Sequence, residues 1–470
     1  MIAIRSIIMI AAGTLILASC ASAERDEDTA GDRQVEELGT IPQEAHVAAC
    51  QGGRWSCYAR VRTDAAHRIR PFAGPSGLRP ADLASAYKLD PARAPTSTIA
   101  IVDAFHYPNA ESDLARYRSQ FGLPPCTRAN GCLKIVNQHG RRSPLPARSP
   151  ANDDWSVEAA LDLDLASAAC PSCNLVLVEA DDDRGDGLFV AQNAAAAMPG
   201  VVAISNSWGG PSNGDDVSAD ARFFAHPGVA IFVATGDNGN TGSTPDYPST
   251  SAHVIAVGGT SLVRSSSAAR GWTEGAWSGA GSSCSRLTPK PSFQSQTACP
   301  NRAASDVSAV ADPNTGLAVF NADAGGWIVV GGTSAASPFV AGVFARYGLI
   351  ANDASFVYQH ASQFFDVTTG DNGSCSGPVC HAGSGWDGPT GIGTPNGAVL
   401  GGSASNGDGD GGDTGDDACE HPICERGADL DASCDPCAAA VCEVDSFCCA
   451  HRWDARCVSE VSAVCRQACD

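Results

Sequence analysis

The chain has 470 residues, a formal net charge of −22 and 21 cysteines. Lysine and arginine number 30 against 52 acidic residues, which argues against a nucleic-acid-binding protein because such a protein presents a basic face. The hydrophobic content of 43% excludes a wholly disordered chain, and the many cysteines exclude an ordinary reduced cytosolic enzyme.

The N-terminus predicts export. Arg5 precedes an apolar run, Ile7–Leu17, which is too short to span a bilayer and suits the core of a secretory signal. The run ends in Leu-Ala-Ser-Cys, which resembles a bacterial lipoprotein cleavage box in which Cys20 becomes the lipidated first residue. The alternative is ordinary cleavage after Ala23. We expect residues 1–23 to hold the signal peptide, and the protein to be secreted or held at the outer membrane or cell surface through Cys20 alone.

The region from 78 to 400 reads as one large α/β domain, preceded by a short, polar, pro-like segment at 24–77. Apolar strand-like runs alternate with helical patterns, which predicts a mostly parallel sheet with helices on both faces and sites at the carboxyl ends of strands. The predicted strands are 98–103, 174–178, 201–205, 229–234, 254–257 and 327–330, and the predicted helices are 109–120, 154–169, 187–198, 218–225 and 334–349.

The C-terminal part reads as a linker followed by a small module. Residues 401–418 are mostly Gly, Asp and Ser, which favours a flexible linker over a calcium loop, since no amphipathic helix flanks them. Residues 419–470 hold ten cysteines in 52 positions, which predicts a disulfide-rich module. The alternative is zinc bound through Cys434 and Cys437, but no second such pair completes a site.

The other cysteines fall into close pairs, apart from Cys20. We predict five short disulfide loops, with the Cys170-Pro-Ser-Cys173 pair as a structural clip rather than a redox motif because it follows a helix. The predicted pairs are Cys50 with Cys57, Cys126 with Cys132, Cys170 with Cys173, Cys284 with Cys299 and Cys375 with Cys380.

Gly331–Pro338 carries the strongest chemical signal. A glycine pair after a strand allows a sharp turn and places Ser334 at a helix start, near backbone N–H groups and the positive end of the helix dipole. This suits a nucleophile whose attack creates an oxyanion, although a lone serine there would more often be a helix cap. A histidine base is doubtful, since the only His-Gly, at His139, lies in a polar stretch.

A pair of acids can replace that base. Glu158 and Asp162 lie four residues apart on one predicted helix, so they share a face and titrate as a pair. The surrounding alanines and leucines argue against a solvated acidic face. Asp237 follows a buried strand in a Gly-Asp-Asn-Gly turn; when protonated, it can donate a hydrogen bond to an oxyanion, which predicts activity in acid.

These stretches, with Ser205–Gly210, resemble the sedolisin, or serine-carboxyl peptidase, family across about residues 78–400. The resemblance implies a subtilisin-like fold in which Ser334 is the nucleophile, Glu158 the general base, Asp162 its support and Asp237 the oxyanion donor. Ser207, Trp208 and Gly209 would bind substrate backbone, with Asp103 as a supporting acid near Trp208. The family's long pro-segment has no counterpart of similar length in residues 24–77.

The resemblance also implies one calcium ion. Two carboxylates and backbone carbonyls in Gly-rich loops suit a hard cation, although turn aspartates are the alternative. The implied ligands are the side chains of Asp366 and Asp387 and the carbonyls of Val367, Gly383 and Gly385.

We therefore expect an exported, monomeric endopeptidase that acts on proteins or peptides at acidic pH and binds no nucleic acid. Two alternatives stay open: a subtilisin-like protease that uses Asp103 and a histidine, and a non-catalytic binding protein on a peptidase scaffold.

Overall fold

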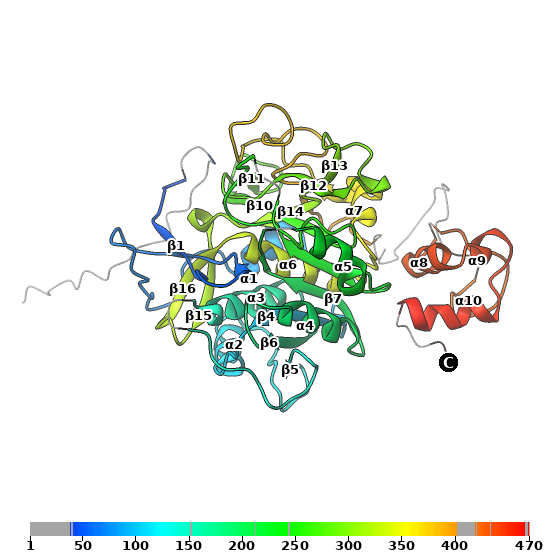
Figure 1. The fold of residues 1–470 in the computed structure, drawn as a ribbon, viewed down its shortest axis with the longest axis horizontal. Helices are drawn as coiled ribbons and strands as arrows, with labels where there is room; N and C mark the ends of the chain where they lie inside the picture. The colour runs from blue at the N-terminus through cyan, green and yellow to red at the C-terminus, as the bar shows by residue number, and fades with distance from the viewer. Residues whose placement is uncertain are drawn as a thin grey trace, which may run out of the picture. The chain divides into compact units, whose positions relative to one another are not determined.

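The computed structural model describes residues 38, 41–150, 153–211, 213–242, 245–401, 419, 421–432, 434–465 and 469. Its main sheet has eight strands. Six of them are parallel to their neighbours in the order β5 (Leu133–Asn137), β6 (Asn174–Ala180), β4 (Thr98–Ala104), β7 (Val201–Asn206), β9 (Ala230–Ala234) and β10 (Ile255–Arg264) (Figure 1). Beside β10 lie β14 (Val307–Val310), which is parallel, and β11 (Trp272–Ala276), which is antiparallel. The predicted mostly parallel sheet is confirmed.

Two wholly buried helices hold the centre of the molecule. Every residue of α3 (Trp155–Ala169) and of α6 (Thr333–Tyr347) is buried, which is typical of core helices. They approach closely, because a Cβ added at Gly342 would lie 2.6 Å from the Cβ of Ala169. Every residue of β4 is also buried, so both faces of the sheet are covered, with α4 (Gly187–Ala196) packed on β4, β6 and β7.

The segment before residue 78 is paired with the rest of the domain. A four-stranded sheet has the order β1 (His46–Ala48), β3 (Arg60–Arg62), β16 (Gly326–Gly331) and β15 (Leu317–Asn321), all antiparallel. The strand predicted at 327–330 is therefore real but lies outside the parallel sheet. A second contact joins β2 (Ser56–Cys57) to β8 (Trp208–Gly209).

The helix predicted at 218–225 begins at Gly214 instead. Further described elements complete the domain. They are α1 (Pro80–Ala86), α2 (Ala110–Gln120), α5 (Gly214–Phe224), β12 (Ser283–Pro289), β13 (Asn301–Ala304), α7 (Ser355–Gln359), β17 (Phe364–Phe365), β18 (Thr394–Pro395) and the short turns Ser292–Gln294, Pro313–Thr315 and Ala361–Gln363.

All five predicted disulfide loops are present. Both sulfur-bearing residues of the Cys170–Cys173 pair are buried, which agrees with a structural clip. Within the described residues, no helix combines the length and the apolar character that a bilayer crossing requires. The predicted signal peptide, Cys20 and nearly all of the predicted linker at 401–418 lie outside the described residues.

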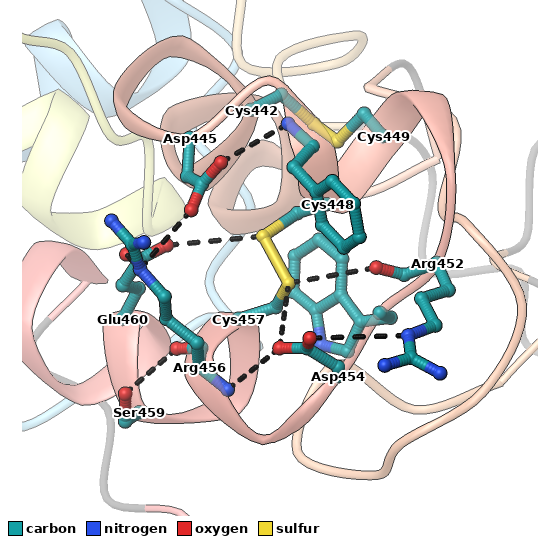
Figure 2. The surroundings of a disulfide bond; sticks show 12 residues. Cys442, Asp445, Cys448, Cys449, Arg452, Asp454, Arg456, Cys457, Ser459 and Glu460 are labelled. Atoms are coloured by element: carbon teal, nitrogen blue, oxygen red, sulfur yellow. Dashed lines mark hydrogen bonds and ion pairs between the residues drawn. A yellow bond between two sulfur atoms is a disulfide. The ribbon is translucent and has the colours of Figure 1, made fainter.

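Five further disulfides hold the C-terminal module. It consists of α8 (Pro436–Val444), α9 (Phe447–Ala450), α10 (Ala455–Glu460) and a π-helical turn at Val461–Cys465. Cys434 and Cys437 pair with Cys419 and Cys465, so the zinc alternative is wrong. Figure 2 shows the Cys448–Cys457 disulfide beside Arg456, which forms ion pairs with Asp445 and Glu460. The other two pairs are Cys424–Cys469 and Cys442–Cys449.

Candidate active site

Ser334 lies in the first turn of α6, where β16 turns sharply into the helix. Gly332 makes this turn at φ 101°, a conformation that side chains other than glycine's rarely allow. The Ser334 Oγ donates to the carbonyl of Ser207 at 3.2 Å and accepts from the Tyr58 N–H at 3.1 Å. The structure therefore places a buried hydroxyl at the positive end of a core helix, as the sequence predicts.

Glu158 and Asp162 lie one turn apart on α3 and are both fully buried. Glu158 Oε2 accepts from the Ala59 N–H at 2.9 Å, and Asp162 Oδ1 accepts from the Ser207 hydroxyl at 2.9 Å. Burial raises the pKa of both carboxyls, and Asp103 raises them further, while a hydrogen bond with Ser334 lowers the pKa of Glu158. These acids are therefore a coupled pair that can hold a proton, and not a solvated face.

Asp103 lies at the end of β4 and is 1% exposed. Burial, followed by the neighbouring Glu179, raises its pKa to about 8. The Trp208 indole N–H donates to the Val102 carbonyl at 2.9 Å, which brings Trp208 beside the end of this strand. The structure thus brings Asp103 next to the acid pair, where a proton on it would reduce the repulsion among the carboxyls.

Asp237 lies in the turn that follows β9, opposite the start of α6. Its Oδ1 accepts from the backbone N–H of Thr333 at 2.8 Å and from the Thr333 hydroxyl at 3.0 Å. Its Oδ2 forms an ion pair with Arg60 Nε at 3.2 Å. Burial raises the pKa of Asp237 to about 6, although Arg60 and Thr333 oppose this shift. A carboxyl with this pKa is protonated in mild acid and can then donate a hydrogen bond.

The predicted backbone-binding residues form one edge of the site. Ser207 contacts both the acid pair and the nucleophile, because its hydroxyl donates to Asp162 while its carbonyl accepts from Ser334 Oγ. Trp208 and Gly209 form β8, which pairs antiparallel with β2. A Cβ at Gly209 would lie 2.4 Å from the Tyr58 hydroxyl, so glycine leaves the room that the Tyr58 ring occupies.

Sequence reasoning missed the residues that fill this site, Tyr58, Ala59 and Arg60. They bond Ser334, Glu158 and Asp237 respectively. The only signal in the sequence is the neighbouring Cys50–Cys57 pair, whose sulfur atoms lie within 4.8 Å of a Glu158 carboxylate oxygen. The short spacing of this pair predicts a loop but not what the loop contacts.

The loops expected to bind calcium come together at one place. Asp387 Oδ2 accepts from the Gly383 N–H at 3.1 Å, and Asp366 Oδ2 accepts from the Gly385 N–H at 3.0 Å. Asp387 is buried, as is Val367, while Asp366 is exposed. In the described part of the chain, neither carboxyl has an ion pair with a basic side chain. Two acids that neighbouring loops bring together without such a partner fit a cation site.

No histidine of the described residues takes part in the Ser334 site. The Ser334 hydroxyl has hydrogen bonds with Tyr58 and Ser207, and the groups that shift the pKa of Glu158 and Asp162 include no histidine. His106 instead bonds Glu179 at 2.8 Å, and His139 lies in an exposed turn. The histidine-dependent alternative therefore lacks the side chain that it requires.

Comparison with known proteins finds similarity to subtilases and sedolisins. Residues 151–355 match a model of the subtilase family, and residues 417–469 match a domain of unknown function. Kumamolisin of Bacillus sp. is 30% identical over 365 residues, and sedolisin of Pseudomonas sp. is 28% identical over 360 residues. A solved structure of Pseudomonas sedolisin, a serine-carboxyl proteinase complexed with two molecules of pseudo-iodotyrostatin, matches with a TM-score of 0.58 and 27% identity.

The extent of these matches differs. The sedolisin structure matches over 70% of this chain and 98% of its own. The kumamolisin match covers 70% of this chain and 64% of kumamolisin, and the sedolisin sequence match covers 68% and 60%. The chain therefore spans a little under two thirds of the length of these curated relatives.

Proposed function

Because the chain belongs to the subtilase family, with the expected resemblance to sedolisins confirmed, we propose that it is an exported serine-carboxyl endopeptidase that cleaves proteins or peptides in acid. The observation that carries this proposal is the placement of Ser334 beside the buried Glu158–Asp162 pair, with no histidine among the described residues of the site. Ten disulfides agree with export, because such bonds persist in oxidising compartments.

The two buried acids, Glu158 and Asp162, assist the acylation of Ser334. Glu158 takes the proton of Ser334 as Oγ attacks the substrate carbonyl carbon, and then donates that proton to the departing amine. Asp162 holds Glu158 in place and stabilises the proton that it gains, while the Ser207 hydroxyl holds Asp162. Water then attacks the ester on Ser334, with Glu158 again as base, and restores the free hydroxyl.

Asp237 supplies the hydrogen bond for the oxyanion. Its protonated carboxyl donates to the negative oxygen that forms on attack, and the donor is lost when the carboxyl ionises. An ionised Asp237 would also repel the oxyanion. We therefore assign the acid requirement to Asp237 together with the carboxyl base.

Substrate binds as an added strand along β8. Trp208 and Gly209 offer backbone groups for antiparallel pairing, and the Ser207 carbonyl accepts the N–H of the residue whose carbonyl is attacked. This places the substrate carbonyl between Ser334 and Asp237.

One calcium ion would be held by the loops at Asp366 and Asp387. Asp366 and Asp387 supply carboxylates, and Val367, Gly383 and Gly385 are the proposed carbonyl donors. The ion offsets the repulsion between the two carboxylates and crosslinks two loops, which is a structural role. We also propose that the chain carries a signal peptide, that Cys20 is lipidated and that the protein is monomeric, as expected from the sequence.

Cleavage of an unfolded protein from about pH 3 to 9, with calcium present, tests the function. We expect the wild type to be active only in acid. We expect Ser334→Ala and Glu158→Gln to lower the rate of cleavage by about 1,000-fold or more. Asp164→Asn is the matched control, because Asp164 is also buried on α3 but accepts from the Phe320 N–H outside the site. Activity at neutral pH that survives Glu158→Gln would contradict the proposal.

A further inference from the structure

A line of ionisable side chains leads away from the Ser334 site towards the surface. Asp103 on β4 and Glu179 on β6 are Cα partners in neighbouring parallel strands, so their side chains lie on the same face of the sheet. They are 1% and 0% exposed, respectively. His106, in the loop after β4, ends the line, and its side chain is 23% exposed. Asp103 therefore connects the acid pair of α3 to a partly solvated imidazole through Glu179.

The loop after β4 supplies two partners for the Glu179 carboxylate. His106 Nδ1 lies 2.8 Å from Glu179 Oε2 and 3.0 Å from Oε1, and the Tyr107 N–H donates to Oε1 at 3.0 Å. Burial raises the pKa of Glu179, and both partners oppose that shift. An imidazole is protonated in acid, so His106 then provides the positive charge that a buried carboxylate needs.

The backbone turn that carries His106 is strained. Phe105 adopts φ 65°, which is uncommon for a residue other than glycine. The Phe105 N–H donates to the Ala180 carbonyl at 2.7 Å, and the His106 N–H donates to the Ala147 carbonyl at 2.8 Å. These two bonds hold the turn and set the imidazole against Glu179. Strain that the surroundings maintain beside a cluster of acids is a reason to look for a function in the contact.

Asp103 depends on its proton. In the described part of the chain, no N–H or hydroxyl donor meets either of its carboxyl oxygens. The groups that it affects are the acid pair, Glu158 and Asp162, and the group that affects it is Glu179. An ionised Asp103 would be a buried charge without compensation, next to other acids. We call Asp103 and the acid pair together the buried acids.

The other elements packed around this line bring no further charge to it. On β5, Asn137 is in register with Glu179, and α4, which packs on β4 and β6, has no charged residue. Asp164, the third acid of α3, accepts instead from the Phe320 N–H. The groups that shift the pKa of Glu179 include no charged side chain other than His106.

We propose that His106 and Glu179 are positioning residues that direct the negative charge of the buried acids to Glu158, and this rests on the proposed function. The Glu179 carboxylate, held ionised by His106, favours the proton on Asp103. When the buried acids lose one proton, that proton leaves the acid pair, and the charge lies beside the nucleophile. Without the charge on Glu179, Asp103 competes for the ionised form, and Glu158 then keeps its proton and cannot serve as the base.

A double-mutant cycle on kcat/KM tests this inference, with the full chain and a synthetic peptide at the pH optimum of the wild type. Glu179→Gln removes the charge with little change in size, and should lower kcat/KM by about 10-fold, the effect of about one pKa unit of preference for a proton on Asp103. His106→Gln should cause a similar loss. In an Asp103→Asn background, where residue 103 cannot ionise, neither substitution should change kcat/KM by more than about 2-fold.

The matched control is His139→Gln, which removes a histidine from an exposed turn outside this line and should leave kcat/KM unchanged. Thermal unfolding of each variant identifies any loss that comes from misfolding. If Glu179→Gln does not fold, His106→Gln still decides the question, because His106 is partly exposed and its replacement leaves no buried charge unpaired once Glu179 is protonated.

The outcomes separate this inference from the proposed function. If the wild type cleaves the peptide in acid and both Glu179→Gln and His106→Gln cleave it equally fast, the inference is wrong and the function stands. Equal losses with and without Asp103→Asn would show that the two residues support the fold and not the placement of charge, which also overturns the inference. A wild type that cleaves no peptide at any pH overturns both.

Discussion

Four buried carboxyls determine the chemistry at the residue scale. Glu158, Asp162, Asp103 and Asp237 are each at most 6% exposed. Among the described residues, Glu158 and Asp162 accept hydrogen bonds but form no ion pair, and the Asp103 carboxylate has neither kind of partner. Burial disfavours the ionised form of each, and each ionised neighbour disfavours it further. The site therefore retains protons that free carboxyls would have lost, which is what a carboxyl hydrogen-bond donor needs in acid.

The first prediction concerns Asp237→Asn. An amide donates a hydrogen bond at every pH, whereas the carboxyl donates only below its pKa, which is raised to about 6. We expect the wild-type rate to fall about 10-fold per pH unit above that value and the rate of the variant to stay nearly flat from about pH 5 to 7. The pH profile of kcat/KM for a synthetic peptide measures this difference.

The control for that variant is Asn238→Ala. It alters the same turn but removes only a contact to Arg60. An unchanged alkaline limb in Asp237→Asn would show that another group sets the pH dependence. The assignment of Asp237 as donor would then fail.

The second prediction concerns side-chain preference. Asp246 accepts the Tyr58 hydroxyl, and a hydrogen bond to a charged group contributes about 1.5–3 kcal/mol. We expect wild type to prefer peptides with tyrosine over phenylalanine before the cleaved bond by about 10-fold or more, and Asp246→Ala to lose that preference. Paired kcat/KM values test it. Asp220→Asn is the control, because Asp220 bonds Tyr247 instead, and an unaltered ratio in Asp246→Ala would refute the assignment.

At the scale of elements, two core helices and two strand ends position the site. The glycine turn before α6 and the apolar residues around Glu158 are local patterns, so the sequence predicts both helices and the residues they present. The strands β1, β2 and β3 are two or three residues long, and β2 and β3 pair with β8 and β16, which lie far along the chain. Such short strands have no periodicity to read, and so the occupant of the cleft could not be predicted.

The third prediction concerns the loops at Asp366 and Asp387. If they bind calcium, chelation should lower the free energy of unfolding by about 3 kcal/mol when calcium had been at 100 times its Kd. Calorimetry with and without a chelator measures the shift, and metal analysis of the dialysed protein should find one ion per chain. Asp366→Asn should weaken the effect. Asp371→Asn, a neighbouring acid outside the proposed ligand set, is the control, and identical unfolding with and without calcium would exclude the site.

At the scale of the whole molecule, the parallel sheet and the disulfide pattern follow from the sequence. The alternation of strand-like and helical segments and the spacing and number of cysteines can all be read from the sequence alone. The sequence does not predict that β16 lies outside the parallel sheet. Its apolar run is like those of the central strands, and only pairing with β3 and β15 decides its direction. Tertiary pairing of this kind overrides local pattern.

The last prediction is that the folded protein loses stability as the pH rises from about 4 to 8. Burial raises the pKa of Asp103 to about 8 and that of Asp237 to about 6, so the folded state keeps protons that the unfolded chain releases. A raised carboxyl pKa contributes stability that is fully present below the pKa of the unfolded chain and is lost as the pH rises to the pKa of the folded state. One pKa unit is worth about 1.4 kcal/mol, so the two shifts together amount to several kcal/mol. Calorimetry of Ser334→Ala, which cannot digest itself, at fixed excess calcium measures it. Asp103→Asn should flatten the curve, and stability that instead increases towards pH 8 would show that these acids are not protonated in the fold.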